Sequence, residues 1–437
     1  MSKLNRRNFL GLAGASAIGV AATPLLGAGT ANAAMSVSKL NTPSQSIGLQ
    51  LYSVRNLISG TGAVGFAATF EELARIGFNE VEFAGYTQGN VGAITTAQIK
   101  GLLDGNGLKA IGSHISWNNL TNPSLNTLEF ERAVELGMPF IGTANDFPGT
   151  TVAAIQAGAA LFAAAQVKAA TYGLRIYQHN HANEFMFTDD APSRRRYEIF
   201  IEAVQAAGGW AAGAFLEMDI LWAYGGARKY AVPGGSNNRG VPLPGGAFGF
   251  DPADWVAANP ERYVLFHTKD GLPNTDPAQG NSYTPAEFGA GTIDFRSFFK
   301  KVGAKTEHHP LWEHDNAPST PAVLGGAMGA AERSFDAMFA TRTLTWLDEL
   351  AALVARLVAD GRVKAAVGDD LLGRVNNAIK RYEGGHEESA IGYLGQFIAK
   401  VNNQVKGDAD AKAVLMGDAQ IILDWLQQSE DKENGVV

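Results

Sequence analysis

The chain of 437 residues predicts an α/β protein, a (β/α)₈ TIM barrel followed by a small all-α domain. Eight short apolar segments recur about every thirty to fifty residues from Ser46 onward, and longer amphipathic stretches separate them. After Thr341 the short apolar segments stop, and apolar residues recur only at three- and four-residue spacing. We therefore expect a barrel over 45–340 and a helical bundle over 343–430.

The apolar segments have the length and composition of strands, and the stretches between them have helical periodicity. Such alternation predicts parallel strands joined by crossover helices, and eight units favour a closed barrel. An open doubly wound sheet is the alternative, but the first strand lacks the G-x-G-x-x-G turn of a dinucleotide-binding version. The expected strands are Ile47–Leu51, Glu80–Phe83, Lys109–Ser113, Phe140–Thr143, Leu174–Gln178, Ala214–Asp219, Tyr263–His267 and Pro310–Glu313. The clearest helices between them are Phe70–Ile76, Ala97–Leu103, Leu128–Leu136 and Ala153–Ala170.

The alternation is interrupted after the sixth strand, between Trp222 and Phe250. Gly225-Gly226 opens a segment rich in glycine and proline that is too long for an ordinary connection. Because it follows a barrel strand, the segment is expected at the mouth of the barrel, either as a wall or lid of a substrate cleft or as a surface insertion.

Four helices are expected in the C-terminal domain: Leu344–Asp360, Gly368–Tyr382, Glu387–Val405 and Ala409–Gln428. Glycines separate them, as at Gly361 and Gly407. The spacing resembles that of the FIMAH domain, in the pattern Leu350, Leu353-Val354, Leu357, Gly361, Leu371-Leu372, Ala378, Gly385, Ala390 and Phe397. The resemblance implies no chemistry, but the domain is where we expect a homo-oligomeric or surface partner to bind.

Residues 1–34 predict an export signal rather than part of a fold. A basic start precedes an apolar, small-residue stretch, and Ala31-Asn32-Ala33 is a typical cleavage signal. Arg6-Arg7-Asn8-Phe9-Leu10 resembles the twin-arginine export motif. We expect a mature chain from about Ala34, located in the periplasm, at the cell surface or outside the cell, without a stable membrane span. An uncleaved membrane anchor is the alternative, which the glycine, alanine and proline content disfavours.

Composition excludes several classes of protein. With 46% hydrophobic and 18% charged residues, the chain is neither wholly disordered nor fibrous. The formal net charge of −8 argues against nucleic acid as a partner. The absence of cysteine excludes disulfides, thiolate metal sites, iron–sulfur clusters and cysteine nucleophiles. Any metal must therefore be bound by Asp, Glu, His or water.

Polar residues gather where the predicted strands end, which is where the strands of a (β/α)₈ barrel converge on one mouth. The residues at these ends are His114, Gln178–Glu184, Asp219, His267–Asp270 and Trp312–Asp315. A single strand-end Asp is more often a helix cap, and a single His is more often structural. Their coincidence on several strands instead predicts a divalent-cation site. Carboxylates with imidazole suit Mn²⁺ best, with Mg²⁺, Co²⁺ or Zn²⁺ as alternatives.

Seven segments resemble, in order and spacing, the sugar phosphate isomerase/epimerase (xylose isomerase-like) TIM barrel family. They span about 45–335 and are Ile47–Arg55, Gly77–Glu82, His179-Asn180-His181-x-x-Glu184-Phe185, Met218-Asp219-x-x-Trp222, His267-x-Lys269-Asp270, Gly289-x-Gly291-x-Ile293-Asp294-Phe295 and Trp312–Asp315. In that family a Glu, an Asp, a His and a second Glu hold one divalent ion. The resemblance implies Asp219, His267 and Glu313 as ligands, with Glu184 preferred as the fourth and His179 as the alternative.

The resemblance implies an enzyme that moves a proton next to a sugar carbonyl through an enediolate. The candidate acids and bases are His181, His179, Glu184 and Glu313, with Lys269 as a stabiliser of oxyanion charge. For Lys269 a salt bridge with Asp270 is the structural alternative. The candidate substrate contacts are His114, Glu82 and Trp222, although Trp222 is equally consistent with a core residue.

The expected substrate is an unphosphorylated carbohydrate, because sugar phosphates are scarce outside the cytoplasm and the strand-end motifs contain no P-loop or arginine cluster. The leading interpretation is a metal-dependent isomerase or epimerase. A lyase or dehydratase that cleaves a 3-keto-glycoside or inosose by β-elimination is second. A non-catalytic carbohydrate-binding exported protein is the alternative from another class. A multinuclear zinc endonuclease and a G-x-S-x-G hydrolase are disfavoured by composition and motif.

Overall fold

The computed structural model describes residues 46–85, 91–191, 194–231, 249–302 and 308–433, with side chains to residue 427. The chain divides into two compact units at residue 340. The first holds the predicted barrel and the second the predicted helices. The predicted export signal at 1–34 lies outside the described residues.

The first unit contains an eight-stranded parallel sheet in the order β3-β2-β1-β10-β7-β6-β5-β4. The two end strands, β3 and β4, meet through a parallel bridge between His114 and Gly142, where Ile115 N–H donates to the Gly142 carbonyl at 2.8 Å. The sheet is therefore a nearly closed barrel, as predicted. Its strands are β1 (Gly48–Gln50), β2 (Glu80–Phe83), β3 (Lys109–Ser113), β4 (Phe140–Thr143), β5 (Arg175–His179), β6 (Phe215–Asp219), β7 (Tyr263–His267) and β10 (His309–Trp312).

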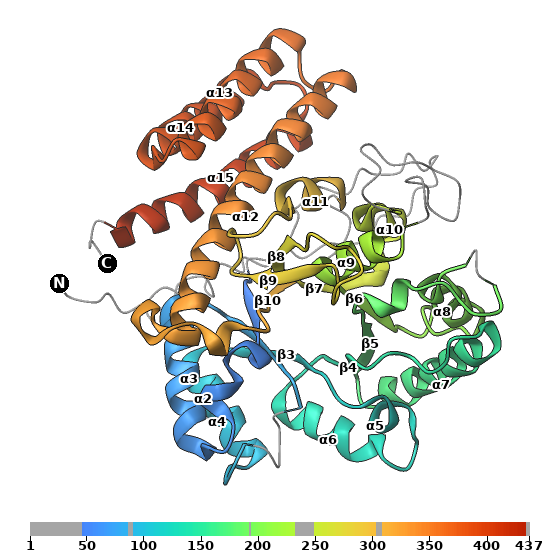
Figure 1. Ribbon diagram of the computed structural model, residues 1–437. Helices are drawn as coiled ribbons and strands as arrows, with labels where there is room; N and C mark the ends of the chain where they lie inside the picture. Colours follow the sequence, from blue (N-terminus) through green and yellow to red (C-terminus); the bar gives the residue numbers. More distant parts are fainter. Residues whose placement is uncertain (1–45, 86–90, 192–193, 232–248, 303–307, 434–437) are drawn as a thin grey trace. The chain divides into compact units, whose positions relative to one another are not determined.

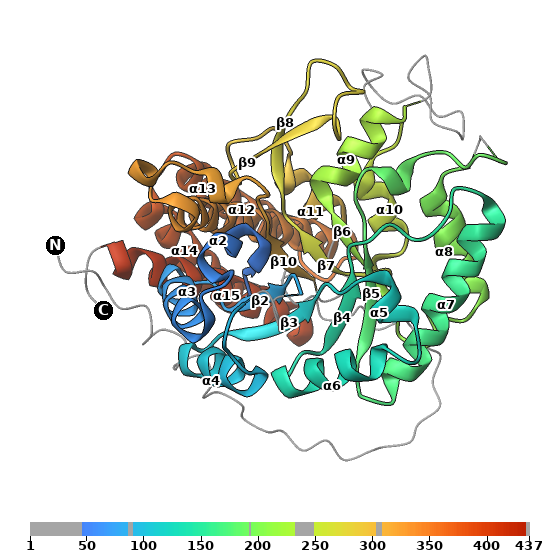
Figure 2. The same cartoon turned by 60° about the horizontal axis from the view of Figure 1, so that its bottom comes forward.

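Helices surround the strands, with α4, α6, α7 and α8 on the outside of β2 to β6 (Figures 1 and 2). The helices are α2 (Arg55–Ile58), α3 (Gly62–Ile76), α4 (Thr96–Asn106), α5 (Trp117–Thr121), α6 (Asn126–Leu136), α7 (Val152–Ala170), α8 (Arg196–Ala206), α9 (Ile220–Lys229), α10 (Pro252–Ala258) and α11 (Phe295–Val302). Of the helices in the described residues, α7 alone is long and apolar enough to cross a bilayer. Its buried face, which includes Ile155 and Phe162, instead belongs to the apolar core of the barrel unit.

The interior of the barrel is layered, because alternate residues of each strand point inward. The lower layer is apolar and contains Ile111, Phe140, Tyr177, Phe215, Val264, Leu265 and Leu311. On β6 the inward positions run from Phe215 to Glu217 and Asp219, so the same strand passes from an apolar floor to a polar mouth. The aromatic rings of the floor pack closely, with the Phe140 and Phe215 centroids 4.8 Å apart.

The Gly225-Gly226 pair does not open a loop, so this part of the predicted insertion is wrong. Both residues lie within α9, where a Cβ on Gly225 would overlap the Asn281 carbonyl and one on Gly226 would overlap the Phe185 side chain. Close packing, rather than turn formation, explains these glycines. The rest of the segment, at 232–248, lies outside the described residues.

A short antiparallel hairpin, β8 (Asp270–Pro273) with β9 (Tyr283–Ala286), follows β7 and was not expected from the sequence. Its first residue, Asp270, accepts hydrogen bonds from the backbone of Gly271, Gly289, Gly291 and Ile293. The alternative interpretation of Lys269, a salt bridge with Asp270, is therefore not what the structure shows. Asp270 organises the backbone of this loop, and Lys269 turns toward the barrel mouth.

The second unit is a bundle of helices with its own apolar core, which includes Trp346, Leu350, Leu394, Phe397 and Leu415. Its helices are the C-terminal part of α12 (Gly326–Ala359), α13 (Ala365–Glu383), α14 (Glu387–Gln404) and α15 (Ala409–Glu433), and α13 lies beside α14 (Figure 1). The first helix was expected to start at Leu344, but α12 is continuous from Gly326. No proline or helix-ending glycine marks the boundary between the two units.

We predict that Gly142→Ala destabilises the barrel, because a Cβ on Gly142 would overlap the ring of the buried Tyr177. Overpacking of this kind costs about 1–3 kcal/mol, measurable as a lower free energy of unfolding in urea. Gly101→Ala is the control, because Gly101 lies in α4 with no heavy atom within 4 Å of its built Cβ. It should stabilise α4 by about 0.5–1 kcal/mol. Equal stability of the two variants would contradict the packing argument.

Candidate functional site

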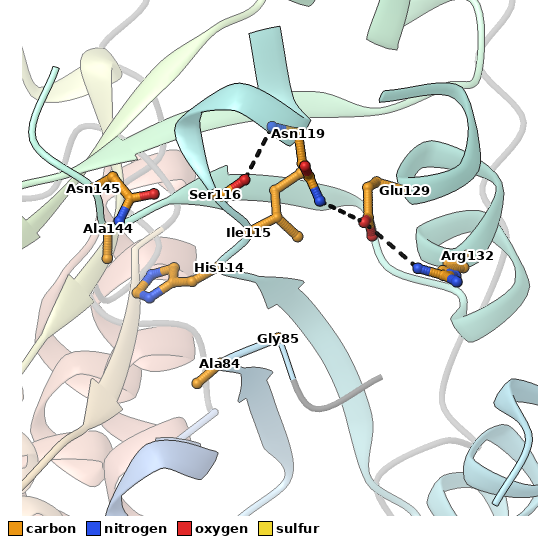
Figure 3. A pocket seen from close by; sticks show the side chains of 10 residues that line it. All are labelled: Ala84, Gly85, His114, Ile115, Ser116, Asn119, Glu129, Arg132, Ala144 and Asn145. Carbon is orange, nitrogen blue, oxygen red and sulfur yellow. Dashed lines mark hydrogen bonds and ion pairs between the residues drawn. The ribbon is translucent and has the colours of Figure 1, made fainter. Parts of the chain in front are cut away.

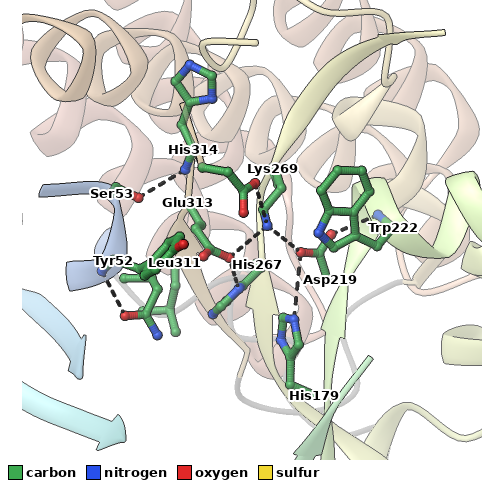
Figure 4. Close-up of polar contacts among 12 residues, drawn as sticks. Tyr52, Ser53, His179, Asp219, Trp222, His267, Lys269, Leu311, Glu313 and His314 are labelled. Carbon is green, nitrogen blue, oxygen red and sulfur yellow. Dashed lines mark hydrogen bonds and ion pairs between the residues drawn. The ribbon is translucent and has the colours of Figure 1, made fainter. Parts of the chain in front are cut away.

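Polar side chains from six strands meet inside the mouth of the barrel. Figure 4 shows those of His179, Asp219, His267, Lys269 and Glu313. We call the full set the mouth cluster. It consists of Glu82, His114, His179, Glu217, Asp219, His267, Lys269, Glu313 and Asp315. All but His114 and Asp315 are buried, so their charges interact through little water.

Three of the four predicted metal ligands lie together at the end of β6, β7 and β10. Ligand atoms of Asp219, His267 and Glu313 all lie within 4.8 Å of one another. His267 Nδ1 is 2.6 Å from Glu313 Oε2. Asp219 caps α9 through Oδ1, which accepts the Trp222 N–H at 2.8 Å, and its buried Oδ2 accepts no hydrogen bond from the described residues. One carboxylate oxygen is thus held by the helix while the other points into the cluster.

The structure places Glu184 apart from these three residues. Glu184 lies in a short 3₁₀ turn (Asn183–Phe185), where its Oε2 accepts the His181 N–H at 2.9 Å. Its carboxylate forms a separate group with Asp146 and the His181 ring. His179 instead lies beside Asp219, with its Nε2 at 3.8 Å from Asp219 Oδ2. Of the two alternatives for the fourth ligand, His179 is the residue that the fold brings to Asp219.

Next to these three candidate ligands, imidazoles and carboxylates alternate in a buried network. Glu217 Oε2 lies 2.7 Å from His114 Nε2 and 3.0 Å from His179 Nδ1. Glu82 Oε2 lies 2.6 Å from His267 Nε2. Glu82 also accepts hydrogen bonds from Gln50 Nε2, at 2.7 Å, and from the Tyr177 hydroxyl. The network fixes the ring orientation of each histidine, as second-layer carboxylates do at metal sites.

Burial and charge pull the pKa values of this network in opposite directions. Burial lowers the pKa of His114, but Glu82 and Glu217 outweigh it and raise that pKa to about 10. Burial raises the pKa of Asp219 to about 7, although Lys269 and His267 oppose it. Burial lowers the pKa of His181 to about 4. The mouth cluster and the neighbouring His181 therefore contain side chains that differ in protonation state although they lie close together.

Lys269 supplies the fixed positive charge of the mouth cluster. Its Nζ lies 3.1 Å from Asp219 Oδ2, 2.9 Å from Glu313 Oε2 and 2.9 Å from Asp315 Oδ2. Burial lowers the pKa of its ammonium group, but the three carboxylates outweigh this and hold the pKa well above its usual value. Lys269 is therefore an ammonium ion suited to stabilising negative charge, and it is a poor proton acceptor.

The three predicted substrate contacts have different surroundings. His114 lines a cavity and is partly exposed. Trp222 is 6% exposed, with its ring centroid 4.9 Å from Lys269 Nζ. Glu82 is fully buried, and its oxygens are taken by the network described above. Glu82 therefore orients His114 and His267 by accepting their ring N–H groups.

Sequence reasoning did not single out Glu217, Tyr177 or Asp315. Each lies two residues from a predicted site residue, Asp219, His179 or Glu313, and strand periodicity places it on the same face. That spacing is the signal that would have found them. Asp146, in the loop after β4, has no such signal, because its position depends on the path of the loop.

We predict that Lys269→Met strongly destabilises the metal-free barrel, because it removes the ammonium group that pairs with Asp219, Glu313 and Asp315. Removing one partner of a buried charge pair costs about 3–5 kcal/mol. The measurement is the free energy of unfolding in urea with a chelator present. Lys300→Met, at an exposed position of α11, is the control and should change it by less than about 0.5 kcal/mol. A Lys269 variant as stable as the Lys300 variant would show that the carboxylates are protonated or hydrated.

Comparison with known proteins supports both units. Residues 347–424 match the model of the FIMAH domain, as the C-terminal spacing predicted. None of the curated proteins compared with the chain matches it. Among solved structures, a sugar phosphate isomerase/epimerase from Parabacteroides distasonis is 19% identical with a TM-score of 0.51, covering 68% of this chain and 93% of its own. A xylose isomerase domain protein from Alicyclobacillus acidocaldarius is 15% identical with a TM-score of 0.48, covering 69% and 99%. At 19% identity the likeness to the Parabacteroides distasonis structure shows a shared barrel fold.

Proposed function

We propose that the barrel is a divalent-metal-dependent isomerase or epimerase that acts on an unphosphorylated carbohydrate. The observation that carries the proposal is the convergence of Asp219, His267 and Glu313, with ligand atoms within 4.8 Å of one another in a buried mouth. The sugar phosphate isomerase/epimerase from Parabacteroides distasonis has the same barrel fold, which is consistent with this chemistry.

The residues present fit a divalent cation. The buried Asp219 Oδ2 lies 3.1 Å from Lys269 Nζ without hydrogen-bond geometry, so this oxygen already faces one cation and could also coordinate a metal ion. We propose His179 as the fourth ligand in place of Glu184, because its Nε2 faces Asp219 Oδ2. Two carboxylates and two imidazoles suit Mn²⁺, and Co²⁺ or Zn²⁺ are also compatible.

The cation would supply Lewis-acid polarisation of a sugar carbonyl, which acidifies the adjacent C–H bond. His181 is the proposed base, because it is partly exposed, is mostly neutral at pH 7, and packs against the His179 ring with centroids 4.9 Å apart. Lys269 is proposed to stabilise the negative charge of the enediolate. Glu184, whose burial and nearness to Asp146 raise its pKa well above the usual value, is the proposed proton donor for the second step.

The preference for an unphosphorylated substrate is supported by the charge of the mouth. Lys269 is already paired with three carboxylates, and Glu82 and Glu217 add further negative charge close by. His114 and His267 are in turn paired with these two carboxylates, so the mouth cluster offers a phosphate dianion no unpaired cationic side chain. The same proposal includes export of the protein by residues 1–34, because sugar phosphates are scarce outside the cytoplasm.

A second candidate is β-elimination from the same enediolate by a lyase or dehydratase. It is favoured by one observation, a cavity of about 450 Å³ lined by His114, because elimination requires room for a leaving group next to the reacting sugar. Isomerisation and elimination share the first proton transfer. They differ in the next step, in which the enediolate is either reprotonated or expels a leaving group.

We predict that the metal-free protein binds one Mn²⁺ per chain, measured by isothermal titration calorimetry. Asp219→Asn should weaken this binding by at least about tenfold to a hundredfold. Mutation of a residue that only supports a metal ligand already lowers metal affinity by that factor, and loss of a ligand should lower it at least as much. Asparagine caps helices as well as aspartate does, so α9 should persist. Asp104→Asn, at an exposed position of α4, is the matched control. Equal Mn²⁺ affinity of the two variants would refute the assigned site.

We predict that the Mn²⁺-loaded protein exchanges solvent deuterium into a free or 3-keto sugar at the carbon next to the carbonyl. Proton NMR in D₂O measures the exchange, and release of an aglycone in the same tubes would identify the lyase. His181→Gln should slow exchange by about 10²- to 10⁴-fold, because it removes the base. The Asp104→Asn protein should retain the wild-type rate. If no sugar of a broad panel gains deuterium with Mn²⁺ bound, enediolate chemistry is wrong for this barrel.

A further inference from the structure

A cavity of about 450 Å³ opens next to the mouth cluster, within the size range of small-molecule sites (Figure 3). The loops after β2, β3 and β4 form it together with α5 and α6. Its polar lining consists of His114, Ser116, Asn119, Glu129, Arg132 and Asn145. None of these residues except His114 belongs to the proposed reaction.

His114 connects the cavity to the mouth cluster. Its ring lines the cavity, while its Nε2 lies 2.7 Å from Glu217 Oε2. The same Glu217 oxygen lies 3.0 Å from Nδ1 of His179, the proposed fourth metal ligand. A molecule that passes His114 therefore has one end near the reacting centre and the other among the residues of the cavity.

The cavity is polar, and its one charged pair is balanced. Glu129 Oε1 accepts a hydrogen bond from Asn119 Nδ2 at 3.1 Å and lies 3.5 Å from Arg132 Nη1. The Glu129 and Arg132 side chains are only 13% and 20% exposed, so each charge is held in place by the other. Ser116 Oγ accepts the Asn119 N–H at 3.0 Å, which leaves its hydroxyl proton to donate elsewhere. The third ionisable group of the lining, His114, is paired with two carboxylates of the mouth cluster. A lining of donors and acceptors whose charges are already paired suits hydroxyl groups better than a phosphate or carboxylate.

We propose that this cavity is a subsite for a neutral, hydroxyl-rich group, such as a second glycosyl unit, attached to the sugar that reacts at the mouth cluster. This inference rests on the proposed function and narrows its substrate class to glycosides and oligosaccharides. Asn119 positions the group by hydrogen bonding. The Glu129–Arg132 pair selects against anionic groups, because the charge of the arginine is already neutralised.

The test is calorimetric binding to the full-length Mn²⁺-loaded protein. The probes are glucose and a panel of glucose disaccharides: cellobiose, trehalose, maltose and gentiobiose. Two or more additional hydrogen bonds predict that the best disaccharide binds at least about tenfold more tightly than glucose. Asn119→Ala should weaken disaccharide binding by about five- to tenfold. Glu131→Gln, at an exposed position of α6 outside the cavity, is the control and should leave it unchanged.

The charge balance is tested by Glu129→Gln, which leaves Arg132 without its carboxylate. The affinity for a uronic acid analogue of the best disaccharide, relative to the neutral sugar, should rise by about fivefold. Glu131→Gln removes the same charge from the same helix and should not change this ratio. Melting temperatures of all variants verify that they are folded. An unchanged ratio in Glu129→Gln would refute the selective role of the pair.

The experiments can refute the subsite proposal and the proposed function separately. If no disaccharide binds more tightly than glucose, or if Asn119→Ala binds the best disaccharide as the wild type does, the subsite is wrong even when deuterium exchange succeeds. If deuterium exchange fails with every sugar but the disaccharide preference is present and is lost in Asn119→Ala, the cavity binds the glycosyl group and the proposed reaction is wrong.

Discussion

The balance of buried charge inside the barrel mouth is the interaction on which the rest of the site depends. Unpaired carboxylates at this depth would each cost several kcal/mol, so the fold must surround them with cations or donors. Lys269, His114 and His267 meet this need with contacts between 2.6 and 3.2 Å. A divalent cation at Asp219, His267 and Glu313 would serve the same balance, which links metal binding to the stability of the barrel.

The layered interior explains how a stable barrel holds so polar a mouth. An apolar floor around Tyr177 and Phe215 lies directly below the carboxylates, and the Tyr177 hydroxyl is shared between the two layers through its hydrogen bond to Glu82. The Tyr177 ring packs against the backbone of Gly142, because a glycine has no Cβ to occupy that space. The floor supplies packing, and the network above it orients the histidines for chemistry.

Two residues join local structure to the site. Asp219 ends β6 and caps α9 with one oxygen while its other oxygen faces the cluster, so the strand-to-helix turn orients a candidate ligand. His114 follows β3, takes part in the bridge that nearly closes the barrel, and belongs both to the mouth cluster and to the lining of the cavity. The geometry of the barrel therefore places the mouth cluster, the proposed reaction site, next to the cavity that is the proposed subsite.

The sequence by itself determined the barrel, the helices after it and the position of Asp219, His267 and Glu313 at neighbouring strand ends, because strand periodicity and strand-end position are local properties of the chain. It also contained the spacing that puts Glu217 on the face of Asp219. Only the tertiary structure placed His179 beside Asp219 and Glu184 beside Asp146, because a turn of the chain directs Glu184 away from the other strand ends. It also placed Gly225-Gly226 inside a helix and brought Asn119, Glu129 and Arg132 beside His114. Such contacts join residues from separate loops and helices, so their distances depend on packing that no local pattern records.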